Sequence, residues 1–274
     1  MTLSINTNIA ATRASKYLAT NHQNLQKSLD RLSSGKRITS PSDDAGGLAV
    51  SMKLEHSING LNGAASNISN AISLLKVQDG ILESAGQIVS RMGELKGMYS
   101  DVTKNSTDKA AYNSEYQALI GQLQAMSSAD FNGVQVFAAA ADTTLSVDVA
   151  GTTIGITQQG FDDEINSGAA GGNIVAAQGT QTLDENSTAQ FTKALEAVAA
   201  MRAANGGQVK RLEYALADTN TQITNLTAAN GRIMDVDIAQ ESAALARHQI
   251  LVQASASMVA QANAANNVAL TLLQ

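Results

Sequence analysis

The chain is 274 residues long, carries a net charge of −6 and contains neither cysteine nor tryptophan. The acidic balance argues against a nucleic-acid-binding protein, which would present a basic face. Without cysteine no disulfide can hold the fold, and with 3% aromatic residues a globule would have few large core anchors. A single proline leaves little to break the alanine-rich segments, so the composition predicts long helices whose burial is completed by other chains.

The first predicted helix lies within residues 1–40 and carries an apolar stripe. Its members are leucines spaced by three, four or seven residues, with His22 in the remaining heptad slot: Leu18, Leu25, Leu29 and Leu32. This spacing places the side chains on one face of an α-helix, and such a face needs a partner. Gly35 can end the helix, and Pro41 disfavours helical backbone at the residue before it.

A second, unusually long helix is predicted from about residue 44 to about residue 99. Ser42 is its expected N-cap, and Asp43 and Asp44 fall in the first turn, where the helix dipole favours negative charge. The apolar spacing then continues without a proline, which predicts a helix of about 80 Å at 1.5 Å per residue. A third helix is predicted over about residues 109–128.

The middle of the chain has the character of β structure. FNGVQVF at residues 131–137 indicates a turn that leads into a strand. LSVDV and TTIGIT, separated by Ala150 and Gly151, predict a hairpin. Residues 160–182 are rich in glycine and alanine without periodicity, and we interpret them as a surface loop.

Two further helices are predicted in the C-terminal half. Ser187 and Gln190 form a weak capping box before the first of them, and Asn205–Gly206–Gly207 is a soft point within it. The last helix begins at about Asp237, and its apolar residues recur every seven positions: Ile238, Leu245, Val252 and Val259. This order predicts a mainly α fold, a long antiparallel helical bundle or coiled-coil rod with a small β-hairpin at the turn.

No residue pattern supports catalysis, a cofactor or a metal ion. The histidines at positions 22, 56 and 248 lack metal-ligand spacing. SSGKRIT at residues 33–39 lacks the first glycine of a phosphate-binding loop, and stabilisation of a helix N-terminus accounts for Asp43 and Asp44. The sequence therefore predicts a protein that is not an enzyme. The absence of any run of about 18 apolar residues predicts no membrane insertion.

The two terminal stripes have two interpretations. They could pack only against each other, as an ordinary two-helix pair. However, Leu251 and Met258 lie beside Val252 and Val259 and would stay outside such a seam, which indicates burial on more than one side. One heterologous contact repeated without closure gives a helical filament, so the stripes are interpreted as self-assembly surfaces.

Both ends of the chain resemble bacterial flagellin. INTN at residues 5–8, RLSSGKRI at 31–38 and DDAGGLA at 43–49 match the N-terminal signature of that family. DVDIA at 235–239 and ILVQA at 250–254 match its C-terminal signature. Two long signatures at opposite ends and in the right order make the resemblance specific.

The resemblance covers about residues 1–150 and 190–274 and implies a short flagellin without large variable outer domains. The implied inner coiled-coil domain takes residues 1–40 and 233–274, the outer core domain takes 41–140 and 186–232, and a β-hairpin with a loop takes 141–185.

The resemblance also implies a function. Flagellins leave the cell unfolded through the flagellar type III system and polymerise into the extracellular filament for swimming motility. The implied partners are other copies of the chain, the filament cap, the hook-junction proteins and an export chaperone at the C-terminal helix. A hook–filament junction protein and a secreted coiled-coil adhesin remain as alternatives.

Part of the motif that a vertebrate Toll-like receptor recognises in flagellins is kept. Arg91, Glu94 and Leu95 match it and are the candidate receptor contacts. Gly93 stands where an arginine is common, and Gln122 replaces the usual glutamate. These two departures argue against recognition by the receptor.

Overall fold

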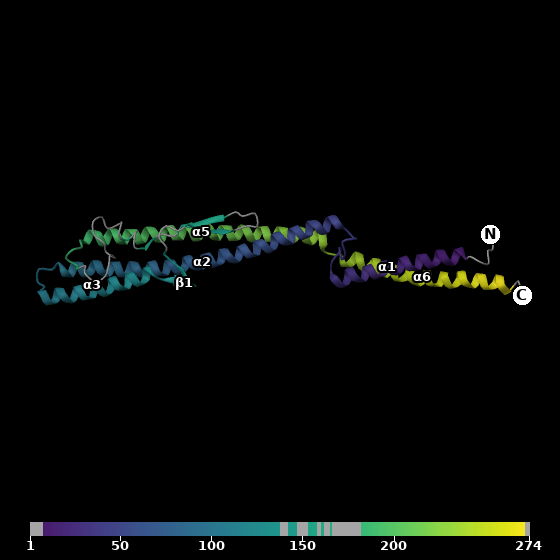
Figure 1. The fold of residues 1–274 in the computed structure, drawn as a ribbon, viewed down its shortest axis with the longest axis horizontal. Coiled ribbons are helices and arrows are strands. Elements are labelled where there is room, and N and C mark those ends of the chain that lie inside the picture. The colour runs from purple at the N-terminus through teal and green to yellow at the C-terminus, as the bar shows by residue number, and fades with distance from the viewer. Residues whose placement is uncertain are drawn as a thin grey trace. The chain divides into compact units, whose positions relative to one another are not determined.

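The computed structural model describes residues 8–137, 142–146, 153–157, 160–161, 165 and 182–271 (Figure 1). Helices make up most of this part: α1 (Ile9–Ser34), α2 (Ala45–Tyr99), α3 (Ser106–Ser127), α5 (Thr188–Met234) and α6 (Ile238–Thr271). The strands are β1 (Asp130–Phe131), β2 (Val134–Gln135), β3 (Asp142–Ser146) and β4 (Thr153–Thr157). The predicted mainly α fold with a small β-hairpin is confirmed.

The chain forms two compact units. Unit 1 contains residues 1–58 and 225–274, and unit 2 contains residues 59–224. Both borders fall inside helices, within α2 and α5. The sequence instead suggested domain borders near residues 40 and 233, where helices break.

The two helix breaks of unit 1 are joined to each other, which explains why they do not divide the units. The Arg37 backbone N–H donates to the Met234 carbonyl at 2.6 Å, and the Val236 N–H donates to the Gly35 carbonyl at 3.1 Å. Gly35 ends α1 with a φ of 70°, a left-handed conformation that glycine adopts at little cost. The predicted end of this helix is confirmed.

Asp44 is the N-cap of α2. Its Oδ1 accepts a hydrogen bond from the Gly47 backbone N–H at 2.8 Å, which satisfies one free donor of the first turn. The prediction of Ser42 as the N-cap is wrong, since its hydroxyl lies 2.7 Å from that of Ser40. A carboxylate is favoured at the cap because it also interacts with the positive end of the helix dipole.

Asp43 stabilises the turn that precedes α2. Its carboxylate accepts hydrogen bonds from the Thr39 hydroxyl at 3.1 Å and from the Thr39 and Ser40 backbone N–H groups. The bond from the Thr39 hydroxyl is the main reason that the pKa of Asp43 is lowered to about 2. The carboxylate therefore keeps its charge, and the turn its hydrogen bonds, well into the acid range.

The next two helices begin at capping residues. Asn105 Oδ1 accepts from the Asp108 N–H at 2.9 Å, and the Asp108 carboxylate accepts from the Asn105 N–H at 3.2 Å. This complete capping box starts α3 three residues earlier than predicted. At the start of α5, Gln190 Oε1 accepts from the Ser187 N–H at 2.6 Å, as the sequence predicted.

Two antiparallel hairpins follow α3. β1 and β2 pair Phe131 with Val134 around a two-residue turn. Asn132 and Gly133 both have positive φ, 54° and 76°, which a type I′ Asn–Gly turn requires. β3 pairs with β4 and forms the hairpin predicted around Ala150–Gly151, whose turn lies outside the described residues.

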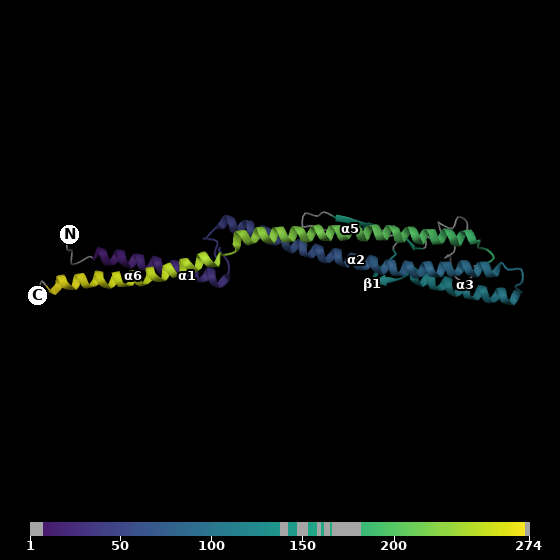
Figure 2. The same cartoon turned by 180° about the vertical axis from the view of Figure 1, so that it is seen from behind.

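The main core of unit 2 lies between α2, α3 and α5, which run side by side in Figure 2. α2 contributes Leu82, Ala85, Val89, Met92 and Leu95; α3 contributes Tyr116, Ile120 and Leu123; α5 contributes Phe191, Ala194, Val198 and Met201. A second cluster joins Ile68, Ala71, Ile72 and Leu75 of α2 with Leu212 of α5 and Ile156 of β4. The β3–β4 hairpin is thus anchored on the helices through the buried side chain of Ile156.

Part of the predicted surface loop is buried. Phe161 and Ile165 are 1% and 0% exposed, and the Phe161 ring lies 5.0 Å from the ring of Phe137. The interpretation of residues 160–182 as a surface loop is therefore wrong at these two positions. Isolated apolar side chains in a glycine-rich stretch give no periodic signal, so the sequence could not show their burial.

The predicted soft point of α5 is a continuous part of the helix. Asn205 is 4% exposed, and its Nδ2 donates to the Leu75 carbonyl of α2 at 2.8 Å. α5 passes through Gly206 and Gly207 without a break. Asn205 thus ties the glycine pair to the neighbouring helix.

Replacing Gly206 or Gly207 by alanine is expected to stabilise unit 2 by about 1 kcal/mol each, because alanine favours helix. A Cβ at either position meets no atom within 4 Å. Urea unfolding followed by circular dichroism measures the change. Gly133→Ala is the contrast, with an expected loss of about 1–2 kcal/mol at its positive φ. A destabilised Gly206→Ala variant would contradict this account of the glycine pair.

Candidate assembly surfaces

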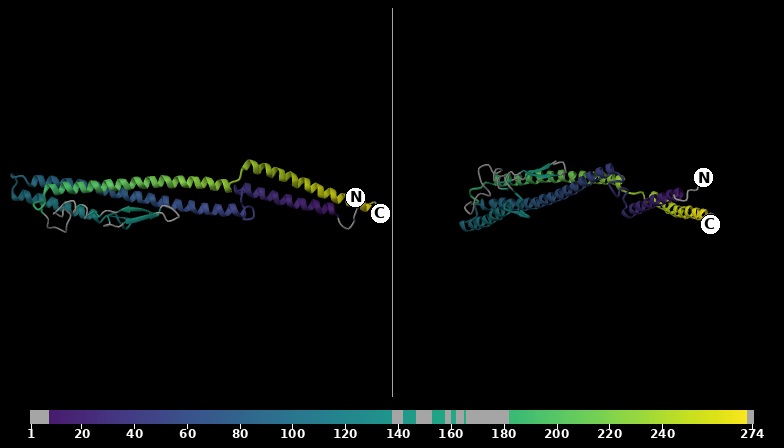
Figure 3. Two further views of the ribbon diagram at one scale, coloured as in Figure 1. Left: turned by 90° about the horizontal axis from the view of Figure 1, so that it is seen from above. Right: turned by 45° about the vertical axis from the view of Figure 1, so that its right-hand side comes forward.

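α1 and α6 of unit 1 lie side by side and antiparallel (Figure 3). Near the start of α1, Asn8 Nδ2 donates to the Ala262 carbonyl at 2.9 Å. Near its end, Arg31 Nη1 lies 3.7 Å from Glu241 Oε2. These two contacts fix the direction and the register of the pair, which we call the α1/α6 seam.

Six of the eight predicted stripe residues lie in this seam. They are half-buried and recur every seven residues: Leu18, Leu25 and Leu32 on α1, and Leu245, Val252 and Val259 on α6. Between the leucines of α1 lie Asn21 and Ser28, and Ser28 is only 3% exposed. Neither residue was predicted for the stripe, although heptad counting from Leu18 places both on the inner face.

Leu29 and Ile238, also predicted for the stripe, lie outside the seam. Leu29 is 42% exposed and Ile238 is 68% exposed. A helix that buries Ser28 turns the next residue toward another side, so the apolar character of Leu29 was misleading. Ile238 is the first residue of α6 and lies level with the end of α1 at Ser34, where no further turn can cover it.

The polar groups of the seam are only partly satisfied. Asn21 Nδ2 donates to Ser255 Oγ at 2.7 Å. His248 Nδ1 and Arg31 Nε are buried without a hydrogen-bond partner, at a typical cost of about 1–3 kcal/mol for such an atom. His22, which the sequence placed in a heptad slot, is exposed. The seam of one chain is therefore weakly stabilised by itself.

Outside the seam, unit 1 exposes large apolar side chains on both helices. They are 40–68% exposed: Ile9, Tyr17 and Leu29 on α1, and Ile238, Ile250, Leu251 and Met258 on α6. Tyr17 and Met258 also line a groove between the helices, together with Ala10 and Ala254. Apolar patches of this kind mark sites of contact with other molecules.

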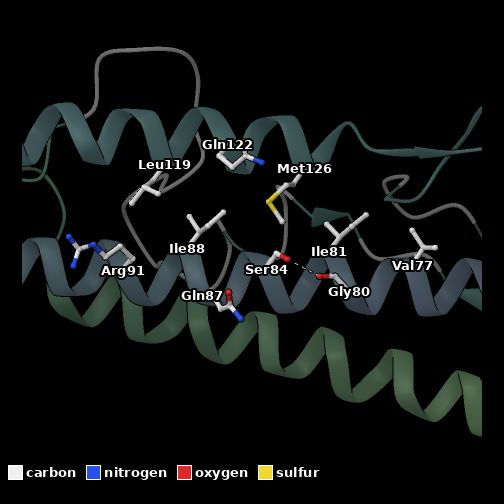
Figure 4. A pocket seen from close by; sticks show the side chains of 10 residues that line it. All are labelled: Val77, Gly80, Ile81, Ser84, Gln87, Ile88, Arg91, Leu119, Gln122 and Met126. Carbon is white, nitrogen blue, oxygen red and sulfur yellow. Dashed lines mark hydrogen bonds between the residues drawn. The ribbon is translucent and has the colours of Figure 1, made fainter.

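A second apolar groove lies in unit 2 between α2 and α3. In Figure 4, Val77, Ile81 and Ile88 of α2 and Leu119 and Met126 of α3 line it. Most of these side chains are half-buried, and Val77 is 39% exposed. We call this surface the α2/α3 groove.

The three candidate receptor contacts do not share a surface. Leu95 is 0% exposed in the core of unit 2, so it cannot contact a receptor while the unit is folded. Arg91 is half-exposed and pairs with Glu115 at 2.9 Å and with Glu94 at 3.0 Å. Both carboxylates raise the pKa of Arg91, and the hydrogen bond with Glu115 has the larger effect. Gln122 borders the α2/α3 groove. The candidate set is thus reduced to Arg91 and Glu94.

Within the ranges that the structure describes, no group of three or more histidine, aspartate or glutamate side chains is placed to hold a metal ion. The helices of the described ranges also include none with the length and apolar character of a membrane span. The described chain thus presents two candidate functional sites. One is the set of exposed apolar side chains on α1 and α6, and the other is the α2/α3 groove.

Two family models match the chain. Residues 5–142 match the bacterial flagellin N-terminal helical region, and residues 188–273 match the bacterial flagellin C-terminal helical region. Together the two models cover more than half of the chain and include α1, α2, α3, α5 and α6. All of the seam and both walls of the α2/α3 groove fall within the matched ranges.

Curated relatives match along nearly the whole chain. The flagellin of Halalkalibacterium halodurans is 34% identical, over 98% of this chain and 99% of its own. The flagellin of Bacillus subtilis is 31% identical with the same coverage. A similar fold is found in a solved structure from Vibrio parahaemolyticus that is assigned to the flagellar hook-associated proteins. The TM-score is 0.59 at 15% identity, and the match covers 70% of this chain and all of that one. The chain therefore belongs to the bacterial flagellin family, and it is a structural subunit of the extracellular flagellar filament.

Proposed function

We propose that this chain builds the filament through unit 1, with the outward faces of α1 and α6 packing against neighbouring copies. The observation that supports this is the set of exposed apolar side chains on both helices, Tyr17, Ile250 and Met258 among them. Burying these side chains between copies stabilises the assembly by about 25 cal/mol for each Å² of apolar surface removed from water. One such contact repeated from copy to copy without closure produces a helical polymer.

The self-assembly stripe then has two parts with different roles. The six seam residues, such as Leu25 and Leu245, hold α1 against α6 within one copy. Leu29 and Ile238 point outward and belong to the contact between copies. The α2/α3 groove supplies a further contact between neighbouring copies, because no described part of the chain covers its apolar wall.

Polymerisation of the purified chain tests this function. Electron microscopy should show long filaments whose subunits contact one another through α1 and α6. The alternative is a junction protein that assembles as a short ring stack, and the fold shared with a hook-associated structure does not distinguish the two. Short rings without filaments would favour that candidate and overturn the first.

Limited trypsin digestion of the free subunit is expected to remove both ends and leave a fragment containing unit 2. The α1/α6 seam buries few large side chains, so it opens easily before neighbours cover it, and Arg13 and Arg247 are exposed on its two helices. In the filament the same sites should be protected. Mass spectrometry of the fragments measures the difference, and equal resistance of the ends in subunit and filament would refute it.

Export and the remaining partners follow the family pattern. The chain crosses the flagellar type III system unfolded, binds an export chaperone through its C-terminal helix, and is added beneath the filament cap beyond the hook-junction proteins. The absence of cysteine supports this route, because no disulfide has to be broken before passage. The unfolded passage is tested by comparing the wild-type chain with a chain whose C-terminal helix is cross-linked to α1. We expect export of the wild-type chain and no export of the cross-linked one.

A further inference from the structure

The chain contains five Asn–Gly dipeptides. They begin at Asn59, Asn62, Asn132, Asn205 and Asn230. An asparagine followed by glycine is prone to deamidation, because glycine has no side chain to hinder attack of its backbone nitrogen on the neighbouring amide carbon. Whether this happens in a folded protein depends on how freely the backbone can reach the required geometry.

Four of the five dipeptides lie inside long helices. Asn59 and Asn62 are in α2, and Asn205 and Asn230 are in α5. In the helix interior the glycine N–H is committed to a carbonyl one turn earlier, and the backbone is held in one conformation. The two asparagine side chains on α5 are also held in place, since Asn205 Nδ2 donates to the Leu75 carbonyl and Asn230 Oδ1 accepts from Ser51 Oγ.

Asn132–Gly133 is different, since it forms the turn of the β1–β2 hairpin. Both residues are exposed, and no atom lies within 4 Å of the position that a Gly133 Cβ would take. Each strand is two residues long, and Phe131 and Val134 beside the turn are 38% and 56% exposed. An exposed two-stranded ribbon of this size opens at a small free-energy cost.

We propose that Asn132 is a modification site at which the folded subunit deamidates. The Gly133 backbone nitrogen loses its proton and attacks Asn132 Cγ, so that a new N–Cγ bond forms. The bond from Cγ to the side-chain nitrogen breaks and ammonia leaves, which gives a succinimide. Water then opens this ring at either carbonyl and yields aspartate or isoaspartate.

Either product changes the hairpin. Aspartate at 132 places a negative charge two residues from Asp130. Isoaspartate also adds a methylene group to the main chain, which disturbs the pairing of β1 with β2. The hairpin leads directly into Val136 and Phe137, which are 1% and 6% exposed in the core of unit 2. The modification therefore weakens an anchor of that core.

The test is an ageing experiment on the full-length chain. Folded subunits are incubated in mildly alkaline buffer, and the five asparagines are followed by peptide mapping with mass spectrometry and by methylation with a protein isoaspartyl methyltransferase. Asn132 is expected to convert at least about tenfold faster than any of the four helical sites, because the hairpin opens more readily than a helix interior. The same chain in denaturant should lose this selectivity.

Asn132→Gly is the matched control. Glycine keeps the positive φ of the turn but has no amide, so isoaspartate should disappear from this segment while the helical sites are unchanged. The proposal is overturned if Asn132 reacts no faster than the helical sites in the folded chain. It is equally overturned if the methyltransferase signal of Asn132→Gly equals that of the wild-type chain.

Discussion

Replacing Leu245 by aspartate is expected to abolish filament formation while unit 2 remains folded. Leu245 is half-buried in the apolar stripe of the α1/α6 seam. A carboxylate there loses water and interrupts the apolar stripe, at a cost of about 2 kcal/mol or more. The seam already contains unpaired polar atoms, so it has little stability to lose.

Sedimentation and electron microscopy of the polymer measure the effect, and thermal unfolding by circular dichroism reports on unit 2. Gln249→Asp is the control, since Gln249 is exposed on the same helix and its replacement adds the same charge. We expect filaments from Gln249→Asp and none from Leu245→Asp. Normal filaments from Leu245→Asp would show that the seam is not required for assembly.

Replacing Leu95 by alanine is expected to lower the free energy of unfolding of unit 2 by about 2–5 kcal/mol. Leu95 is 0% exposed and packs in the core between α2, α3 and α5. Removing three side-chain carbons, two of them methyl groups, from such a site loses apolar burial and leaves a cavity. Urea unfolding gives the change in midpoint from which the free energy is obtained.

Glu94→Ala is the matched control for Leu95→Ala. The Glu94 side chain is 62% exposed and pairs with Arg91 at 3.0 Å, and exposed ion pairs of this kind contribute about 1 kcal/mol or less. The neighbouring positions should therefore differ several-fold in their effect on stability. Equal losses at both would mean that Leu95 is not the core residue described above.

Much of the helical architecture could be predicted from the sequence because its signals are local. Gly35 ends α1, Gln190 caps α5, and no proline interrupts α2 along its length. Caps and heptads act within a few residues, so one sequence suffices to find them. Ser42 shows the limit, because serine and aspartate both cap helices and only the folded turn decides between them.

The candidate assembly surface was predictable in position but not in detail. Leu29 is apolar and well spaced, yet Ser28 is the buried residue of the two. The choice depends on how α1 is rotated against its partner, and a rotation of one residue step exchanges the two. Phe161 and Ile165 show a different limit, since their burial depends on a core assembled from segments far away in the sequence.

Tyr116 gives unit 2 an optical reporter and an alkaline limit. Its ring is buried, edge-on to Phe191, and Asn186 Nδ2 donates to its hydroxyl at 2.9 Å. Burial raises the pKa of Tyr116, so the folded unit favours the neutral phenol. This contribution to stability is complete below the pKa of the unfolded tyrosine, about 10, and is lost as the pH rises through the folded value. The chain has five tyrosines and no tryptophan, so the part of the phenolate absorbance that appears only above the ordinary tyrosine pKa of about 10 records when the core of unit 2 comes apart.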